Sequence, residues 1–413
     1  MNSTIRLILI AILFVSLPSN AQNVIDTWII AGQSNCEGYG ITESPVNGLT
    51  PSTTLSDIGR SDLNVIHNNI RFFQGVNGSN DISKSAGMTQ APKDLWHSMT
   101  SYEGMSFDWG NGLGGESGRR FGYELSFGYE IQQYLTEEIA LIKFAKGGTS
   151  ISSSTKQFND GYWHDFDPID SRLNQYDRLI ATINNAVLNL PAGDVLKIKG
   201  ILWMQGEADA KTTAKAIAYE ANLTELMNQL LVNLEGISSS SNGKLVPEIT
   251  WEETPFIVGT IATPGTNGDI IRTAQAAIAA SKSNVYTVDA TNNLSLMSVD
   301  DWGGNGIHYD TAGQVELGER FATEVLSTTY GNLSMGKFES QSNIGIRPNP
   351  ASNSLELTNI LTSSNYTIYS ITGKQISTGR ILPSETQIKI SLLNAGVYFL
   401  KLGTGNVIRF IKR

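Results

Sequence analysis

The sequence predicts an α/β protein in which helices cover both faces of a parallel sheet, followed by a small all-β domain. The first observation is the regular alternation of short apolar runs with segments of helical spacing between about residues 121 and 326. The second is a change, near residue 344, to short runs of period two separated by turn residues. With 413 residues, 40% hydrophobic and 16% charged, the chain has enough apolar material for one large core and one smaller core.

The strands of the predicted sheet are apolar and rich in β-branched residues. The first run, residues 24–31, ends at Gly32, which indicates a strand that runs into a turn. Further strands are expected at residues 139–145, 195–203, 249–261 and 285–288, and helices at residues 121–135, 214–234 and 311–326. Such an alternation is typical of a three-layer α/β/α fold, which places its functional sites at the carboxyl ends of the strands.

Residues 41–118 interrupt this alternation. They are rich in Gly, Asn, Ser and Asp, have weak periodicity and are too long for an ordinary connection. We interpret them as an insertion that carries loops over the site; a decorated surface loop is the alternative.

The N-terminal residues 1–21 have the layout of a cleaved secretory signal peptide. One basic residue, Arg6, precedes an apolar run at residues 7–17, and small residues at Ser19 and Ala21 precede Gln22. The alternative is a membrane anchor, but the run is shorter than the roughly 20 residues that a spanning helix needs. We therefore expect no integral membrane segment in the mature chain.

Cysteine and charge narrow the possible functions. The chain has a single cysteine, Cys36, which excludes an internal disulfide. Because Cys36 is close to Ser34, its thiol is a possible nucleophile; we favour the alternative that Cys36 is a small buried residue beside the site. Residues 342–413 hold 8 Lys/Arg and 2 Asp/Glu and residues 1–21 hold one basic residue, so residues 22–341 keep 20 of the 29 basic and 37 of the 39 acidic residues. This acidic body argues against binding nucleic acid.

Two motifs that follow predicted strands carry glycine and serine. In Gly32-Gln33-Ser34-Asn35 a serine is presented on a turn, where its hydroxyl and its backbone N–H are both available to a substrate. In Lys146-Gly147-Gly148-Thr149-Ser150 paired glycines let the backbone approach a ligand and expose an N–H, as an oxyanion hole requires. Each motif alone also fits an ordinary turn.

Two further motifs carry the acids and the base. In Trp203-Met204-Gln205-Gly206-Glu207-Ala208-Asp209 the Gln205 amide is a potential oxyanion donor, and the two acids either orient a histidine or cap the next helix. Asn305-Gly306-Ile307-His308 stands before a helix, and His308 is the one of four histidines at such a junction of the predicted sheet. The order from serine to histidine along the chain is one that several hydrolases use.

These four motifs, together with Gly122-Tyr123-Glu124-Leu125, resemble the conserved blocks of SGNH/GDSL hydrolases, specifically the branch of sialate O-acetylesterases and carbohydrate esterase family 6. The resemblance spans about residues 24–328 and implies a flavodoxin-like sheet. It implies that Ser34 attacks the ester carbonyl, that His308 is the general base, and that the oxyanion is held by the N–H groups of Ser34 and Gly148 and the Gln205 amide. It places Gln33, Asn35 and Trp203 at the substrate.

The sequence departs from this family pattern at one position. An acid usually stands three residues before the histidine, where this chain has Asn305. Asparagine accepts from the imidazole N–H but does not stabilise the imidazolium by charge. Glu207 or Asp301 is expected to serve instead, with Glu207 slightly preferred. If neither reaches His308, the domain is a weak enzyme or a binding remnant.

The C-terminal residues resemble a different family. Runs of period two at residues 366–371, 387–391, 397–402 and 407–411 predict a small sandwich-like all-β domain. Arg347-Pro348-Asn349-Pro350-Ala351, Tyr369-Ser370-Ile371-Thr372-Gly373-Lys374 and the terminal Lys412-Arg413 resemble the type A C-terminal sorting domain of type IX secretion. A carbohydrate-binding module is the alternative, but all seven tryptophans lie upstream, so the tail lacks the usual platform for sugar rings.

The expected organisation is a signal peptide (1–21), an SGNH esterase domain (22–335) with the insertion 41–118, a linker (336–343) and a sorting domain (344–413). The expected function is that of a secreted or cell-surface serine acetylesterase acting on acetylated polysaccharide or oligosaccharide, such as acetylxylan or a sialate, without a cofactor. The type IX secretion machinery is the expected partner. A lipid esterase or thioesterase and a silent glycan-binding protein are the alternatives. No metal is expected, because no histidine pair has ligand spacing; His164, Asp165 and Asp167 form only a weak cluster.

Overall fold

The computed structural model divides the chain into two compact units, Met1–Thr329 and Tyr330–Arg413. The residues that it describes are 22–42, 53–75, 94–101, 120–135, 137–152, 162–163, 174–296, 306–330, 346–358, 363–370, 374–384, 386–402 and 407–413. The signal peptide and linker expected from the sequence lie outside these residues.

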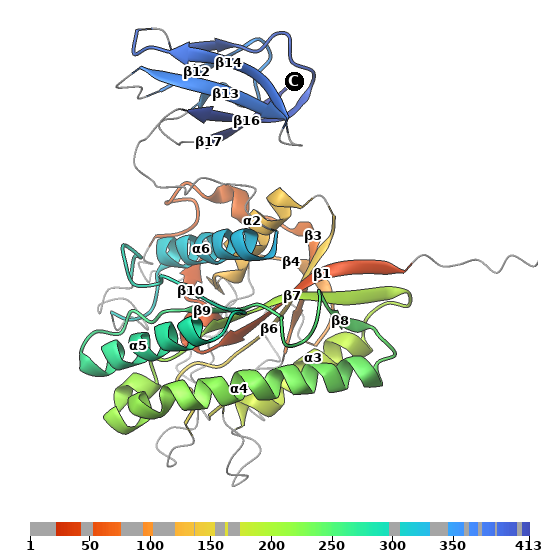
Figure 1. The fold of residues 1–413 in the computed structure, drawn as a ribbon, viewed down its shortest axis with the longest axis vertical. Helices are drawn as coiled ribbons and strands as arrows, with labels where there is room; N and C mark the ends of the chain where they lie inside the picture. The colour runs from red at the N-terminus through yellow and green to blue at the C-terminus, as the bar shows by residue number, and fades with distance from the viewer. Residues whose placement is uncertain are drawn as a thin grey trace, which may run out of the picture. The chain divides into compact units, whose positions relative to one another are not determined.

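The first unit is built on an eight-stranded sheet with the order β10-β9-β7-β1-β6-β3-β4, and with β8 paired to β7 (Figure 1). Every pairing in it is parallel except that of β3 with β4. The strands are β1 (Asn23–Gly32), β3 (His67–Gln74), β4 (His97–Met99), β6 (Ile139–Ala145), β7 (Asp194–Met204), β8 (Leu245–Pro247), β9 (Phe256–Gly259) and β10 (Val285–Val288). Because β1 lies between β6 and β7, their carboxyl ends meet at one place.

Helices cover both faces of this sheet, as Figure 1 shows: α2 and α6 pack together on one face, and α3, α4 and α5 lie on the other. Their bounds are α2 (Glu124–Tyr134), α3 (Gln175–Leu188), α4 (Thr213–Ser240), α5 (Thr266–Ser281) and α6 (Thr311–Thr329). The short elements are α1 (Ser34–Glu37), η1 (Ser61–Leu63), η5 (Asp209–Lys211) and the strand pair β2 (Gly40–Ile41) and β5 (Arg120–Phe121). The three-layer α/β/α fold predicted from the sequence is confirmed.

Most predicted elements are present, with shifted ends. The strand expected over residues 249–261 is reduced to β9, because residues 249–255 form turns before the strand enters the core. Helices α3 and α5 were not predicted. The start of α3 carries a recognisable signal, since the Asn174 side chain accepts hydrogen bonds from Tyr176 N and Asp177 N as an N-cap.

Part of the predicted insertion 41–118 belongs to the sheet itself. Strand β3 pairs in parallel with β6, and β4 extends the sheet beyond it. Residues 67–74 and 97–99 of the expected insertion are therefore strands of the sheet. The period was weak because β3 buries only Ile70, Phe72 and Phe73 among polar neighbours.

A buried ion pair lies beneath α1, the one-turn helix after β1. The Lys143 ammonium on β6 is 2.7 Å from Glu124 Oε2, and both side chains are fully buried. The same ammonium donates a 3.0 Å hydrogen bond to the backbone carbonyl of Glu37, the last residue of α1. Glu124 also accepts from the Gly122 N–H at 2.8 Å. The pair thus anchors α1 to β6 and to the start of α2.

The second unit is an all-β domain of two antiparallel sheets with the orders β11-β12-β15 and β14-β13-β16-β17. The strands are β11 (Ile346–Arg347), β12 (Ser354–Leu357), β13 (Ser364–Ser370), β14 (Gln375–Ile381), β15 (Gln387–Lys389), β16 (Gly396–Leu402) and β17 (Val407–Lys412). Side chains from both sheets share one apolar core, which includes Leu355, Ile368, Ile388, Leu400 and Phe410. The small all-β fold predicted for the tail is confirmed.

Within the part of the chain that the structure describes, no helix combines the length and the apolar character that a membrane crossing requires.

We predict that Lys143→Met lowers the free energy of unfolding of the first unit by about 3–5 kcal/mol, because it leaves a buried carboxyl and a carbonyl without their cation. Denaturant unfolding followed by tryptophan fluorescence measures this unit alone, since all seven tryptophans precede residue 303. The double variant K143M/E124Q should recover part of the loss. The control is Lys197→Met, whose ammonium is part of a half-exposed ion-pair network and should cost less than about 1 kcal/mol. Equal losses in the two single variants would contradict the prediction.

Candidate active site

The nucleophile candidate is presented where β1 and β7 approach each other closely. A Cβ atom on Gly32 would lie 2.0 Å from the Met204 carbonyl oxygen, and Gly32 has φ +153°. The next residue, Gln33, donates its N–H to the same carbonyl at 2.9 Å. Only glycine fits at this position, and the chain turns there into α1 with Ser34 as its first residue.

Ser34 and His308 are within hydrogen-bond distance although they are 274 positions apart. His308 Nε2 lies 3.0 Å from Ser34 Oγ. The two side chains are 5% and 8% exposed, so they remain at the surface of the site but are largely withdrawn from water. The Tyr39 ring stacks on the imidazole with centroids 4.0 Å apart. This geometry suits proton transfer from the hydroxyl to the imidazole.

Asn35 ties the nucleophile turn to the histidine segment. Its Nδ2 donates to the Ile307 carbonyl at 3.0 Å, and its Oδ1 accepts from the Tyr309 N–H at 3.1 Å. The Asn35 carbonyl in turn accepts from Gln314 Nε2 on α6 at 3.2 Å. The residues on both sides of His308 are therefore bound to the residue that follows Ser34.

Glu207 supports this arrangement from behind. Its Oε1 accepts from Asn35 Nδ2 at 2.6 Å, and its Oε2 is buried and makes no hydrogen bond among the described residues. Glu207 thus reaches His308 through Asn35 and not through a hydrogen bond to the imidazole. Asp301 and Asn305, the other candidates for orienting His308, lie outside the described residues. Burial raises the pKa of the Glu207 carboxyl to about 7.

The glycine loop after β6 packs against the nucleophile. A Cβ on Gly147 would lie 3.4 Å from Ser34 Cβ, in van der Waals contact, and 2.7 Å from Glu37 Oε2, which, with Glu37 in this position, leaves room only for glycine. Gly148 has φ +75°, a left-handed conformation that favours glycine. Thr149 then fixes the loop, since its Oγ1 donates to the Lys146 carbonyl at 2.6 Å and accepts from Trp163 Nε1 at 2.7 Å.

The two glutamine amides of the site form a relay. Gln205 Nε2 donates to Asp209 Oδ2 at 2.6 Å, to the Thr149 carbonyl at 3.1 Å and to Gln33 Oε1 at 3.3 Å. Gln33 Oε1 also accepts from the N–H groups of Gly206 and Ala208. The Gln33 Nε2 group is therefore turned to the other side, 3.5 Å from Ser34 Oγ. The amide that faces the nucleophile is that of Gln33, whereas the family resemblance assigns this place to Gln205.

Two residues expected at the substrate lie inside the protein instead. Asn35 and Trp203 are fully buried, and the Trp203 ring packs edge-to-face on Trp163 with centroids 5.0 Å apart. Their place is in the support of the site. Of the three substrate-contact candidates only Gln33 has a side-chain group directed at the nucleophile.

Cys36 is turned away from the histidine. Its Sγ lies 3.8 Å from the Tyr123 hydroxyl, and burial raises the pKa of its thiol to about 12. A thiol with this pKa is a poor nucleophile at neutral pH. The geometry therefore favours Ser34 over Cys36.

Two of the remaining histidines, His67 and His97, contact other parts of the domain. His67 and His97 contact the rings of Tyr129 and Phe72, and His164, with Asp165 and Asp167, lies outside the described residues. Among the residues described, no group of three or more His, Cys, Asp or Glu side chains is arranged to hold a metal ion.

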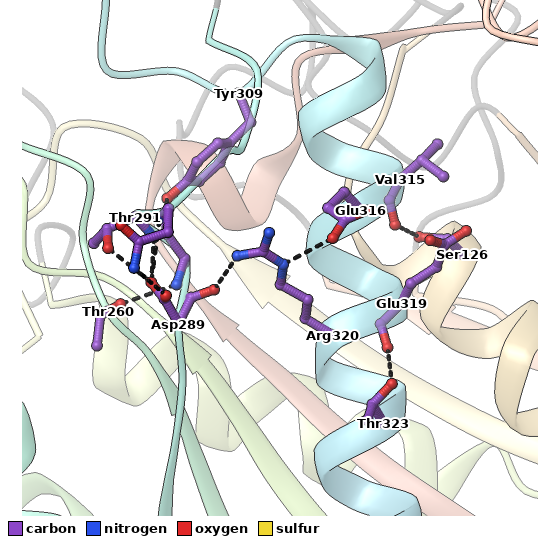
Figure 2. A network of polar contacts seen from close by, with 12 residues as sticks. Ser126, Thr260, Asp289, Thr291, Tyr309, Val315, Glu316, Glu319, Arg320 and Thr323 are labelled. Atoms are coloured by element: carbon purple, nitrogen blue, oxygen red, sulfur yellow. Dashed lines mark hydrogen bonds and ion pairs between the residues drawn. The ribbon is translucent and has the colours of Figure 1, made fainter. Parts of the chain in front are cut away.

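A polar network that the sequence did not reveal supports the histidine segment from its other side. In Figure 2 the Tyr309 side chain points toward Asp289 and Thr291, in the segment that follows β10. Its hydroxyl donates to the Ala290 carbonyl of this segment. Arg320 on α6 donates to the Asp289 carbonyl at 2.7 Å and pairs with Glu316 at 2.9 Å. The residue after His308 is thereby bound to the segment that follows β10, and Arg320 ties the same segment to α6.

The family of the chain follows from a comparison with protein-family models. Residues 24–327 match the model described as carbohydrate esterase, sialic acid-specific acetylesterase. The chain belongs to this family. Residues 345–413 match the model of the secretion system C-terminal sorting domain, that of type IX secretion. Both resemblances expected from the sequence are confirmed, and the tail indicates secretion to the cell surface or exterior.

Other comparisons are more distant. The sequence matches none of the curated proteins with which it was compared. A solved structure of an Arabidopsis thaliana protein is 22% identical, covers 74% of this chain and 98% of its own, and has a TM-score of 0.47. NanS is 16% identical, with the same two coverages and TM-score. A carbohydrate esterase whose active site displays divergent catalytic and non-catalytic binding functions is 13% identical, with coverages of 73% and 68% and a TM-score of 0.29.

We predict that Glu207→Gln removes a pH dependence of stability. The folded state raises the pKa of this carboxyl from 4.5 to about 7, so the folded chain holds the proton more tightly than the unfolded chain. This contribution is fully present below pH 4.5 and is lost as the pH rises through 7. As the pH rises through this range, the free energy of unfolding of the wild type should fall by roughly 3 kcal/mol relative to that of the variant. Denaturant unfolding by tryptophan fluorescence at a series of pH values measures this, and parallel curves for the two chains would contradict it.

Proposed function

We propose that this chain is a secreted serine esterase that removes O-acetyl groups from carbohydrate, with Ser34 as nucleophile and His308 as general base. The observation that carries the proposal is the 3.0 Å distance between Ser34 Oγ and His308 Nε2, in a domain of the carbohydrate esterase family. The substrate class is an O-acetylated glycan, of which sialates and acetylxylan are the two candidates.

The proposed reaction has two steps. Ser34 Oγ attacks the acetyl carbonyl while His308 Nε2 takes the hydroxyl proton, and the imidazolium then passes this proton to the oxygen of the departing sugar hydroxyl. An acetyl-serine remains. Water then attacks it with His308 as base, and acetate leaves as the serine hydroxyl is restored. No cofactor is needed, because the proton moves only between these groups.

The negative charge that develops on the carbonyl oxygen needs donors beside Ser34. Three groups are suited to this: the backbone N–H of Ser34 at the start of α1, the N–H of Gly148, and Nε2 of Gln33. Gln205 stands behind Gln33 and fixes its amide, because it donates to Gln33 Oε1. In this assignment Gln205 serves the oxyanion through Gln33.

Glu207 has a supporting role in this proposal. It accepts from Asn35, and Asn35 holds the backbone of Ile307 and Tyr309 on both sides of the base. In this proposal Glu207 fixes the position of the His308 backbone. The residues that precede His308 in the chain orient its imidazole ring.

The path of secretion completes the proposal. The basic all-β tail is a type IX sorting domain, and such a route begins with export across the inner membrane. Residues 1–21, with an apolar run behind one basic residue, are suited to direct this export as a signal peptide.

We predict that Ser34→Ala lowers the release of acetate by at least about a thousandfold, since it removes the nucleophile. The measurement is acetate release from O-acetylated sialic acid, acetylated xylan oligomers and 4-nitrophenyl acetate, with 4-nitrophenyl palmitate as a long-chain ester. The matched control is Cys36→Ala, which removes the neighbouring thiol and should keep acetate release within about threefold of wild type. Loss of activity in C36A together with retained activity in S34A would make Cys36, and not Ser34, the nucleophile. A faster reaction with palmitate than with acetate would favour a lipid esterase.

A further inference from the structure

Asp209 lies within the site and its carboxylate is fully buried. The proposed reaction gives Asp209 no role. It follows β7 by five residues and opens η5. The capping role that its position in the sequence suggests belongs to another residue, since Thr212 Oγ1 caps α4 by accepting from the Lys215 N–H. Both carboxylate oxygens of Asp209 point instead toward the side of the site where the oxyanion forms.

The first set of contacts holds the glycine loop. Asp209 Oδ2 accepts from the Ile151 N–H at 2.9 Å, and Oδ1 accepts from the Ser152 N–H at 3.3 Å. These two residues continue the chain directly from Gly148 through Thr149 and Ser150. Fixing their N–H groups fixes the path of the loop and thereby the direction of the Gly148 N–H.

The second set of contacts holds the amide relay. Asp209 Oδ2 accepts from Gln205 Nε2 at 2.6 Å, the shortest of that amide's three hydrogen bonds. Gln205 donates in turn to Gln33 Oε1, which leaves Gln33 Nε2 facing Ser34 Oγ. The orientation of this last amide therefore depends on Asp209 through one intermediate side chain.

We infer that Asp209 is a positioning residue for the oxyanion hole, because its carboxylate fixes both the glycine loop and the glutamine amide that would hold the charged oxygen. The inference rests on the proposed function. Asp209 does not touch the substrate; it acts through Ile151, Ser152 and Gln205. Glu207 has the corresponding role on the other side of the site, where it acts through Asn35 on the histidine segment.

The charges around Asp209 agree with an ionised carboxylate. Burial raises the pKa of Asp209 to about 6, while the three N–H donors and the Lys215 ammonium on α4 act in the opposite direction. Lys215 Nζ also donates to Ser150 Oγ at 3.2 Å and so adds to the support of the same loop. The other buried acid nearby is Glu207, and the negative charge of Asp209 adds to the rise of the Glu207 pKa.

The test compares Asp209→Ala and Asp209→Asn with wild type in the hydrolysis of 4-nitrophenyl acetate by the full chain. A misplaced oxyanion donor costs mainly transition-state stabilisation, so kcat should fall about a hundredfold in D209A and KM should stay within about threefold. In D209N the fall should be smaller, about tenfold, because the amide oxygen keeps the bonds at Oδ2 and only the Ser152 N–H then faces a donor. Hydrogen–deuterium exchange of the peptide that holds residues 146–152 should become faster in D209A.

The matched control is the same pair of substitutions at Asp194, at the opposite end of β7. Asp194 is largely buried and binds Arg71 and Asn23, so D194A and D194N should lower the unfolding midpoint but leave kcat within about twofold. If the D209 variants, folded by circular dichroism, match the D194 variants in kcat, the inference is overturned; if D209A does not fold, D209N decides. A fall in affinity alone, seen as a raised KM at unchanged kcat, would also overturn it. A wild-type chain without activity on any acetyl ester would instead remove the proposed function, and the inference with it.

Discussion

The hydrogen bonds of Asn35 are the constraint on which the geometry of the site depends. A serine and a histidine 274 residues apart meet at 3.0 Å, and the order of the strands alone does not define such a distance. Asn35 supplies the missing restraint because its side chain binds the backbone on both sides of His308 and its carbonyl binds α6. The side chain next to Ser34 thus fixes the position of His308, and Glu207 and Tyr309 support that position through further hydrogen bonds.

The sequence predicts best those elements whose apolar residues are continuous. The limits predicted for β6 and β10 agree with the structure. Every residue of β6 is buried, and strands buried on both faces need long apolar runs. Strand β3 could not be found in this way, because its polar residues become strand only through pairing with β6. Helix α5 was not predicted because its many small residues each bury little surface. Its position is determined by its packing on α4 and β10.

Within the site, the sequence predicts the serine and the histidine that the structure brings together, but not the arrangement of the amides. Ser34 follows the end of β1 and His308 lies shortly before α6, each in a motif with few alternatives. Gln33 and Gln205 also follow strand ends and carry the same chemical group, so composition and spacing do not distinguish them. What separates them is the direction of the Gly206 and Ala208 N–H groups, which bind Gln33 Oε1 and turn its Nε2 toward Ser34. That direction is a property of the turn after β7 and appears only in three dimensions.

This turn also shows why the chain keeps two carboxylates inside the protein, where burial makes their charge costly. Glu207 and Asp209 are two residues apart, yet one serves the histidine side and the other serves the oxyanion side. An apolar pair would pack without this cost, but it could not accept the N–H groups of Asn35, Gln205, Ile151 and Ser152, which now bind the two carboxylates. Because both acids follow the end of β7, this one turn supports both the histidine segment and the glutamine amides of the site.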